Sequence, residues 1–124
     1  MSAAPGPEPA QDPPFGVNRR AANGTTIVSL EGDLDLVSAH AAGEALTDAQ
    51  AGGTTVLLDL SALRFIDSSG LRVVLEAQRR AATGGEGARL QVAPGQGEVR
   101  RVFEVSGVGA LLTVVDPPPP ETSE

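Results

Sequence analysis

The sequence predicts an α/β fold: a single domain with a mixed, mostly parallel β-sheet packed with helices. Strand-like and helix-like segments alternate in the order β-β-α-β-α-β-α-β, and 124 residues suffice for one domain with a hydrophobic core. Strands joined through helices run parallel by right-handed crossovers. Only the opening β-β pair is therefore expected to be antiparallel.

The expected sheet begins with a hairpin. Residues 15–22 form a weak first strand, and residues 25–31 are rich in β-branched side chains that favour a second strand. Asn23 and Gly24 lie between the two strands. They predict a tight turn, because both residues tolerate a positive φ.

A helix and a buried strand follow the hairpin. Residues 37–51 are rich in alanine and end at Gly52 and Gly53, which stop a helix. Residues 55–60 (T-V-L-L-D-L) are nearly all apolar, which is typical of a strand buried on both faces. The residues of this helix that recur at helical spacing, and are expected to face inward, are Val37, Ala41, Ala45, Leu46 and Ala49.

The second half of the domain repeats the alternation. A long helix begins near Ser68 or Ser69 and ends before a pair of glycines. The inward stripe expected for this helix is Leu71, Val74, Leu75, Gln78 and Ala82. The remaining elements are a strand over residues 88–92, a short helix over 98–105 and an edge strand over 111–115.

Proline-rich tails flank the domain, which we place at residues 15–115. Nine of the ten prolines lie in residues 1–14 and 116–124, and proline neither donates a ladder hydrogen bond nor continues a helix. We predict that both tails are disordered, although polyproline segments also bind partner domains.

The composition excludes several classes of function. The net charge is −7 and all nine basic residues are arginines, so the clustered cations that bind nucleic-acid phosphates are not expected. The chain has no cysteine, no apolar run long enough for a membrane helix and no secretory signal pattern. We therefore expect a cytoplasmic protein that needs no cofactor and binds neither nucleic acid nor membrane directly.

Two strand-to-helix junctions are the candidate sites, because ligands of α/β sheets gather at the carboxyl ends of parallel strands. The later junction, residues 65–71, reads F-I-D-S-S-G-L, and its two leading apolar residues are expected to anchor the loop in the core. One interpretation is a helix cap alone, formed by Asp67 or Ser68. The other is a small anion site, where Gly70 allows close approach and the helix dipole favours a phosphate on Ser68. Such a phosphate would repel a bound partner without breaking the fold.

The earlier junction, residues 31–37, reads E-G-D-L-D-L-V. Asp33 and Asp35 form an acidic lip that suits Mg²⁺ or a partner's arginine, or else one of them caps the following helix. Neither junction predicts an enzyme. A nucleophilic Ser68 needs a base, and the sole histidine, His40, is expected to face solvent. A small Mg²⁺-dependent phosphatase using Asp33 or Asp35 is a remote alternative, opposed by the short chain.

Three blocks of sequence resemble one family. V-L-L-D-L-S-A-L-R-F-I-D-S-S-G-L-R-V-V-L (residues 56–75) closely resembles the central block of the bacterial anti-sigma factor antagonists, the STAS-domain family. I-V-S-L-E-G-D-L-D (27–35) is similar to the family's strand ending in G-E-L-D, with Asp33 in place of glutamate. V-R-R-V-F-E-V-S-G-V (99–108) is similar to its closing helix. The blocks follow the family's order across the domain, so a STAS-type fold is expected.

The resemblance implies a partner switch. In the family, an anti-sigma factor that is also a serine/threonine kinase phosphorylates the first serine after the aspartate, here Ser68. The unphosphorylated form binds this kinase and frees a sigma factor, and a phosphatase acting on phospho-Ser68 resets the switch. Ser69 is the less favoured acceptor, and Arg72, where relatives carry a small residue, is expected to tune partner choice. The partner-binding residues that the resemblance implies are Gly32, Asp33, Leu34, Asp35, Asp67, Ser69, Gly70, Leu71 and Arg72.

The alternative within the same fold is a scaffold without a phosphoswitch. The resemblance extends to STAS subunits of that kind, which occur in lipid-transport assemblies and stress-sensing complexes.

Overall fold

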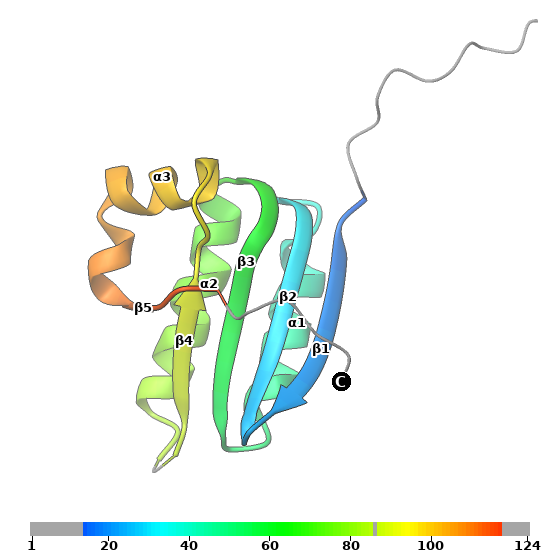
Figure 1. Ribbon diagram of the computed structural model, residues 1–124, viewed down its shortest axis with the longest axis vertical. Coiled ribbons are helices and arrows are strands. Elements are labelled where there is room, and N and C mark those ends of the chain that lie inside the picture. Colours follow the sequence, from blue (N-terminus) through cyan, green and yellow to red (C-terminus); the bar gives the residue numbers. More distant parts are fainter. Residues whose placement is uncertain (1–13, 86, 118–124) are drawn as a thin grey trace, which may run out of the picture.

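The computed structural model describes residues 14–85 and 87–117. Over these residues the sheet has five strands, which lie side by side in sequence order (Figure 1). β1 (Gly16–Ala22) pairs antiparallel with β2 (Thr25–Leu34). β3 (Thr55–Ile66), β4 (Arg89–Ala93) and β5 (Thr113–Val114) each add in parallel. The predicted mixed, mostly parallel sheet is therefore confirmed.

The helices α1 (Ala39–Gln50) and α2 (Ser68–Ala82) lie together behind the sheet in Figure 1. Helix α3 (Glu98–Ser106) lies across one end of the sheet, and a 3₁₀ turn, η1 (Val108–Leu111), connects it to β5. The order of strands and α-helices matches the predicted order. The predicted tails, 1–14 and 116–124, lie almost entirely outside the described residues.

The main core fills the space between the sheet and the two helices. Alternation along each strand sends one set of aliphatic side chains toward α1 and α2 and the other set to the opposite face. On the opposite face, Ile27, Leu57 and Ala93 form a second, smaller cluster. The fully buried large side chains of the core are Leu30, Leu34, Leu46, Leu58, Leu60, Val28, Val56, Val74, Val92 and Val99.

The strands β2 and β3 run further than the sequence predicted. β2 continues to Leu34 and β3 to Ile66, and the register between them shifts twice near their carboxyl ends. At each shift β3 holds one more residue than β2, which is the pattern of a β-bulge. Bulges re-aim side chains, and Phe65 is 44% exposed, so the prediction that it anchors the loop in the core is wrong. Ile66 is buried as predicted.

The inward faces of the helices match the predicted stripes only in part, since α1 buries Leu46 and Ala49 as predicted but Ala42 in place of Ala41. α1 begins at Ala39, and Val37 is 90% exposed on the turn that precedes the helix. In α2 the fully buried positions are mostly small, so the backbone of this helix lies close to the sheet. The buried residues of α2 are Gly70, Val73, Val74, Ala77 and Ala81, of which only Val74 was predicted.

Candidate functional site

The two junctions predicted as sites meet at the carboxyl ends of β2 and β3. The backbone N–H of Asp67 donates to the carbonyl oxygen of Leu34 at 3.2 Å, which joins the end of β2 to the start of α2. Both segments lie at the top of the sheet in Figure 1. The sequence analysis placed candidate sites at both segments, and the parallel pairing of their strands explains why they meet.

Asp67 is the N-cap of α2. Its Oδ1 accepts from the backbone N–H of Ser69 at 2.8 Å and of Gly70 at 3.1 Å. The cap interpretation is thereby confirmed, with Asp67 rather than Ser68 in that role. The same bonds correct the anion-site interpretation, because a carboxylate of the protein already occupies two of the first-turn N–H groups that a phosphate would use.

Gly70 serves the packing of α2 against β2. A Cβ at this position would lie 2.7 Å from Cγ1 of Ile66 and 2.8 Å from both Cγ and O of Leu34. The groups that approach the Gly70 backbone closely are therefore the ends of β2 and β3 and not a ligand. This close approach holds the first turn of α2, with Ser68 as its first residue, against the end of the sheet.

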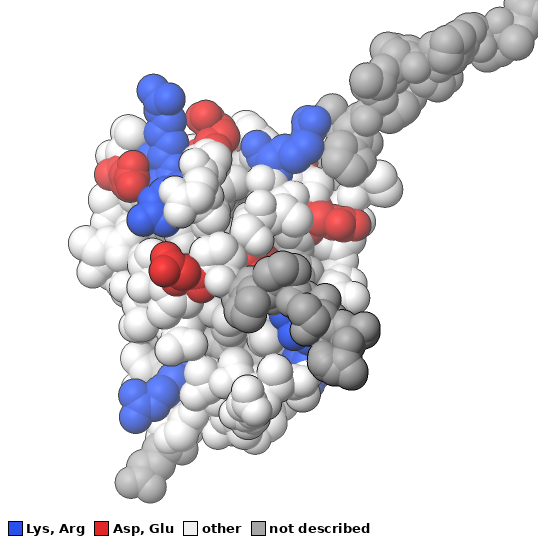
Figure 2. Space-filling view, viewed as in Figure 1, with Lys and Arg blue, Asp and Glu red and all other residues white. Residues whose placement is uncertain are grey.

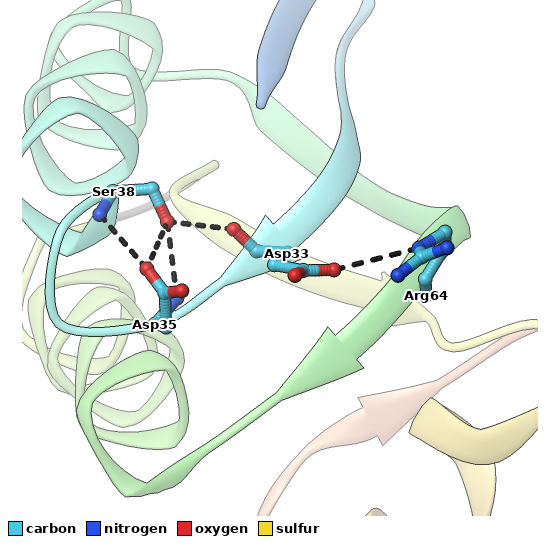
Figure 3. Close-up of polar contacts among 4 residues, drawn as sticks. All are labelled: Asp33, Asp35, Ser38 and Arg64. Atoms are coloured by element: carbon cyan, nitrogen blue, oxygen red, sulfur yellow. Dashed lines mark hydrogen bonds and ion pairs between the residues drawn. The ribbon is translucent and has the colours of Figure 1, made fainter. Parts of the chain in front are cut away.

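The turn between β2 and α1 is closed by Ser38 and Asp35 (Figure 3). The Ser38 hydroxyl donates to the carbonyl oxygen of Asp33 at 2.7 Å and accepts from the backbone N–H of Asp35 at 3.0 Å. Asp35 Oδ1 accepts from the backbone N–H groups of Val37 at 3.1 Å and Ser38 at 3.2 Å. Asp35 thus closes the turn that leads into α1, whereas the N-cap residue of the helix itself is Ser38, whose side chain makes no capping bond. The alternative in which Asp33 or Asp35 caps this helix is therefore not what the structure shows.

Asp33 faces a different partner. Its Oδ1 lies 3.6 Å from Nε of Arg64, which β3 presents across the sheet (Figure 3). Arg64 lies between the β3 partners of Gly32 and Asp33, at the second register shift. Within the described ranges, no group of three or more His, Cys, Asp or Glu side chains is placed to hold a metal ion. The two aspartates therefore have separate structural partners instead of forming one acidic lip.

An open groove runs between α1 and α2, with a volume of about 1040 Å³. Leu36 and Ser68 line it at the end near the junctions, and Arg72 lines it one helical turn after Ser68. Ser68 and Arg72 are exposed. His40 also lines the groove, where its side chain is 86% exposed and contacts Glu44 at 3.2 Å, as predicted for a solvent-facing helix residue.

The predicted partner-binding residues divide by exposure. Three of them, Gly32, Leu34 and Gly70, are buried. These residues support the backbone of the site and do not present side chains to a partner. Arg72 is exposed, and Asp33, Asp35, Asp67, Ser69 and Leu71 are partly exposed. The sequence analysis gave no partner-binding role to four residues of this region: Leu36, Val37, Ser38 and Arg64. Of these, only Ser38 carried a signal, a serine directly before an alanine-rich helix.

The face of the sheet opposite to α1 and α2 carries no large patch of a single charge among the described residues. On the face seen in Figure 2, basic and acidic side chains of the described residues are interspersed. Among those same residues, no helix is long and apolar enough to cross a membrane. The junction and the groove behind the sheet remain the candidate site.

Comparison with known proteins defines the class of protein. Residues 17–114 match the family described as Mlab, STAS domain, so the chain belongs to the STAS-domain family. This match confirms the family expected from the three sequence blocks. The chain is also 40% identical over 53 residues to the anti-sigma-F factor antagonist RsfB of Mycobacterium tuberculosis. That match covers 42% of this chain and 43% of the relative.

Solved structures show the same fold. An anti-sigma factor antagonist from Mycobacterium paratuberculosis superposes with a TM-score of 0.73 at 23% identity, over 82% of this chain and 85% of the other. The Bacillus cell fate determinant SpoIIAA in its phosphorylated form superposes with a TM-score of 0.59 at 25% identity, over 82% and 91%. The arrangement of strands and helices is therefore the STAS arrangement.

Proposed function

We propose that this chain is an anti-sigma factor antagonist that works by partner switching in the cytoplasm. In the unphosphorylated state it binds an anti-sigma factor that is also a serine/threonine kinase, and a sigma factor is released. Phosphorylation of Ser68 ends this binding, and a phosphatase restores it. The chain is the substrate in this cycle, and the chemistry of phosphoryl transfer belongs to the active site of the partner.

The position of Ser68 is the observation that supports this proposal most. Ser68 is exposed, it is the first residue of α2, and it lies at the mouth of the groove between the two helices. A kinase reaches a hydroxyl in such a place without unfolding the helix. Ser69 is only partly exposed, and its backbone is tied to Asp67, so it is the weaker acceptor.

Charge explains how a phosphate on Ser68 would act on the partner. The phosphate adds about −1.5 to −2 charges next to Asp67, whose carboxylate already occupies two N–H groups of the first turn. The added charge therefore remains at the surface. A partner whose surface fits the neutral serine is repelled by this charge. The fold is kept while the interface is lost, which is the behaviour a reversible switch needs.

The test begins with the full chain, ATP and the candidate anti-sigma kinases of the same genome. One phosphate should be added by a cognate kinase, and tandem mass spectrometry should locate it on Ser68. Ser68→Ala should bind the kinase whether or not ATP is present, whereas Ser68→Asp should bind weakly.

Ser69→Ala is the matched control, since it removes the neighbouring hydroxyl and keeps Ser68. It should still be phosphorylated. A phosphate found on Ser69, or no phosphate and no binding with any of the kinases, would show that the proposal is wrong. Recovery of membrane ATPase components or of a large homo-assembly would instead favour the scaffold without a phosphoswitch.

A further inference from the structure

Leu36 and Val37 form an apolar tip on the turn between β2 and α1. The two residues are 77% and 90% exposed, although both are large and aliphatic. A single exposed aliphatic side chain is ordinary on a protein surface, but two adjacent ones at the candidate site call for a partner. Burial of such side chains in an interface contributes to affinity in proportion to the apolar area removed from water.

The tip is held in place before any partner arrives. The backbone N–H of Val37 donates to Asp35 Oδ1 at 3.1 Å, and the backbone N–H of Ala39 donates to the Asp35 carbonyl oxygen at 2.8 Å. The Ser38 hydroxyl, which is buried, ties the same turn to the end of β2. A preorganised apolar tip loses little conformational entropy on binding, so more of its contact energy appears as affinity.

The tip and Ser68 belong to one surface. Leu36 lines the same groove as Ser68. The hydrogen bond between Leu34 and Asp67 also joins the two segments. Leu36 follows Leu34 by two residues, and Ser68 directly follows Asp67. A protein interface of standard size covers about 800 Å² on each partner, a patch roughly 30 Å across. Three chain steps of about 3.8 Å each, together with the hydrogen-bonded span between Leu34 and Asp67, fit well inside such a patch.

We propose that Leu36 and Val37 dock into an apolar pocket of the kinase that phosphorylates Ser68. This inference rests on the proposed function and deepens it, because it separates the contact that selects the kinase from the serine that the kinase modifies. Any partner whose active site encloses the Ser68 hydroxyl also covers the end of the groove that Leu36 lines, and this continuity favours the kinase over a second copy of the chain as the occupant.

The chain provides a closely matched control. Val105 and Leu111 are 80% and 64% exposed and lie on α3 and η1, outside the groove. Leu36→Ser/Val37→Ser and Val105→Ser/Leu111→Ser make the same chemical changes at exposed positions, so neither double variant should alter thermal unfolding much. Both are placed in the Ser68→Ala background, and their affinity for the kinase is measured by calorimetry without turnover.

The tip variant should bind about 30-fold more weakly or worse, whereas the control should bind within about twofold of the parent. With Ser68 present, the tip variant should show a higher KM for phosphorylation and a nearly unchanged kcat. Normal affinity in the tip variant, or an equal loss in the control, would overturn the inference while the proposed function stands. Failure of the parent chain to bind or be phosphorylated by any candidate kinase would overturn both.

Discussion

Ser38 shows how one side chain organises a site without touching a partner. It is 6% exposed, and its hydroxyl bonds both the carbonyl oxygen of Asp33 and the backbone N–H of Asp35. The turn that these bonds close carries the apolar tip and the first turn of α1. Buried polar groups are expensive to leave without partners, so this hydroxyl matters more than its small size suggests.

Ser38→Ala should lower the free energy of unfolding by about 1–2 kcal/mol, because two partly buried backbone groups, the carbonyl oxygen of Asp33 and the N–H of Asp35, lose their partner. Ser61→Ala is the matched control, since it removes a serine hydroxyl that donates to the carboxylate of Asp59 at an exposed site. The control should cost no more than about 0.5 kcal/mol. Denaturant unfolding of both variants measures the difference, and equal costs would contradict the structural role given to Ser38.

At the scale of elements, the contact between α2 and the end of β2 decides where Ser68 lies. The approach is close because Gly70 has no side chain, and Leu34 and Ile66 occupy the space that a Cβ would need. Asp67 adds the cap that starts the helix at this point. Gly70, which the sequence suggested as part of an anion site, and the Asp67 cap are therefore the means by which α2 is positioned.

Gly70→Ala should destabilise the protein by about 1–3 kcal/mol, despite the higher helix propensity of alanine, because the new methyl group overlaps the backbone of β2. Gly43→Ala makes the same change inside α1, where a Cβ would meet nothing within 4 Å. That control should stabilise the protein by about 0.5–1 kcal/mol. Thermal or denaturant unfolding gives both values, and a stabilised Gly70→Ala would refute the close packing.

At the scale of the whole molecule, the fold and the switch are separable. The core lies between the sheet and the two helices, whereas Ser68 lies on the surface at the end of that sheet. A charge added at Ser68 is therefore placed far from most of the interactions that stabilise the fold, and at a helix start that favours negative charge.

A chain carrying phosphoserine at position 68, introduced during synthesis so that no kinase is needed, should unfold within about 1 kcal/mol of the unmodified chain. The same chain should fail to bind the kinase that the unmodified form binds. Denaturant unfolding and calorimetry provide the two measurements. A large loss of stability on phosphorylation would mean that the switch works by unfolding α2 instead of by changing the surface.

The element order and the site region could be predicted from the sequence, because they depend on local patterns. The hairpin turn at Asn23 and Gly24 has the positive φ values that its residue types favour, 54° and 81°. The apolar run 55–60 is a buried strand, and Asp67 caps the helix after it. Periodicity, turn chemistry and capping act over a few residues, and the D-S-S-G-L segment already identified the junction and its serines.

Contacts between distant segments were decided only by the tertiary structure. Local patterns carry no information about the bulges that extend β3 and turn Phe65 outward, or about the approach of Gly70 to Leu34. For the same reason, the sequence placed Val37 inside a helix, whereas the hydrogen bonds of Asp35 and Ser38 hold it on an exposed tip. The sequence by itself determined which segment carries the site, and packing between β2, β3 and α2 decided which of its residues a partner can reach.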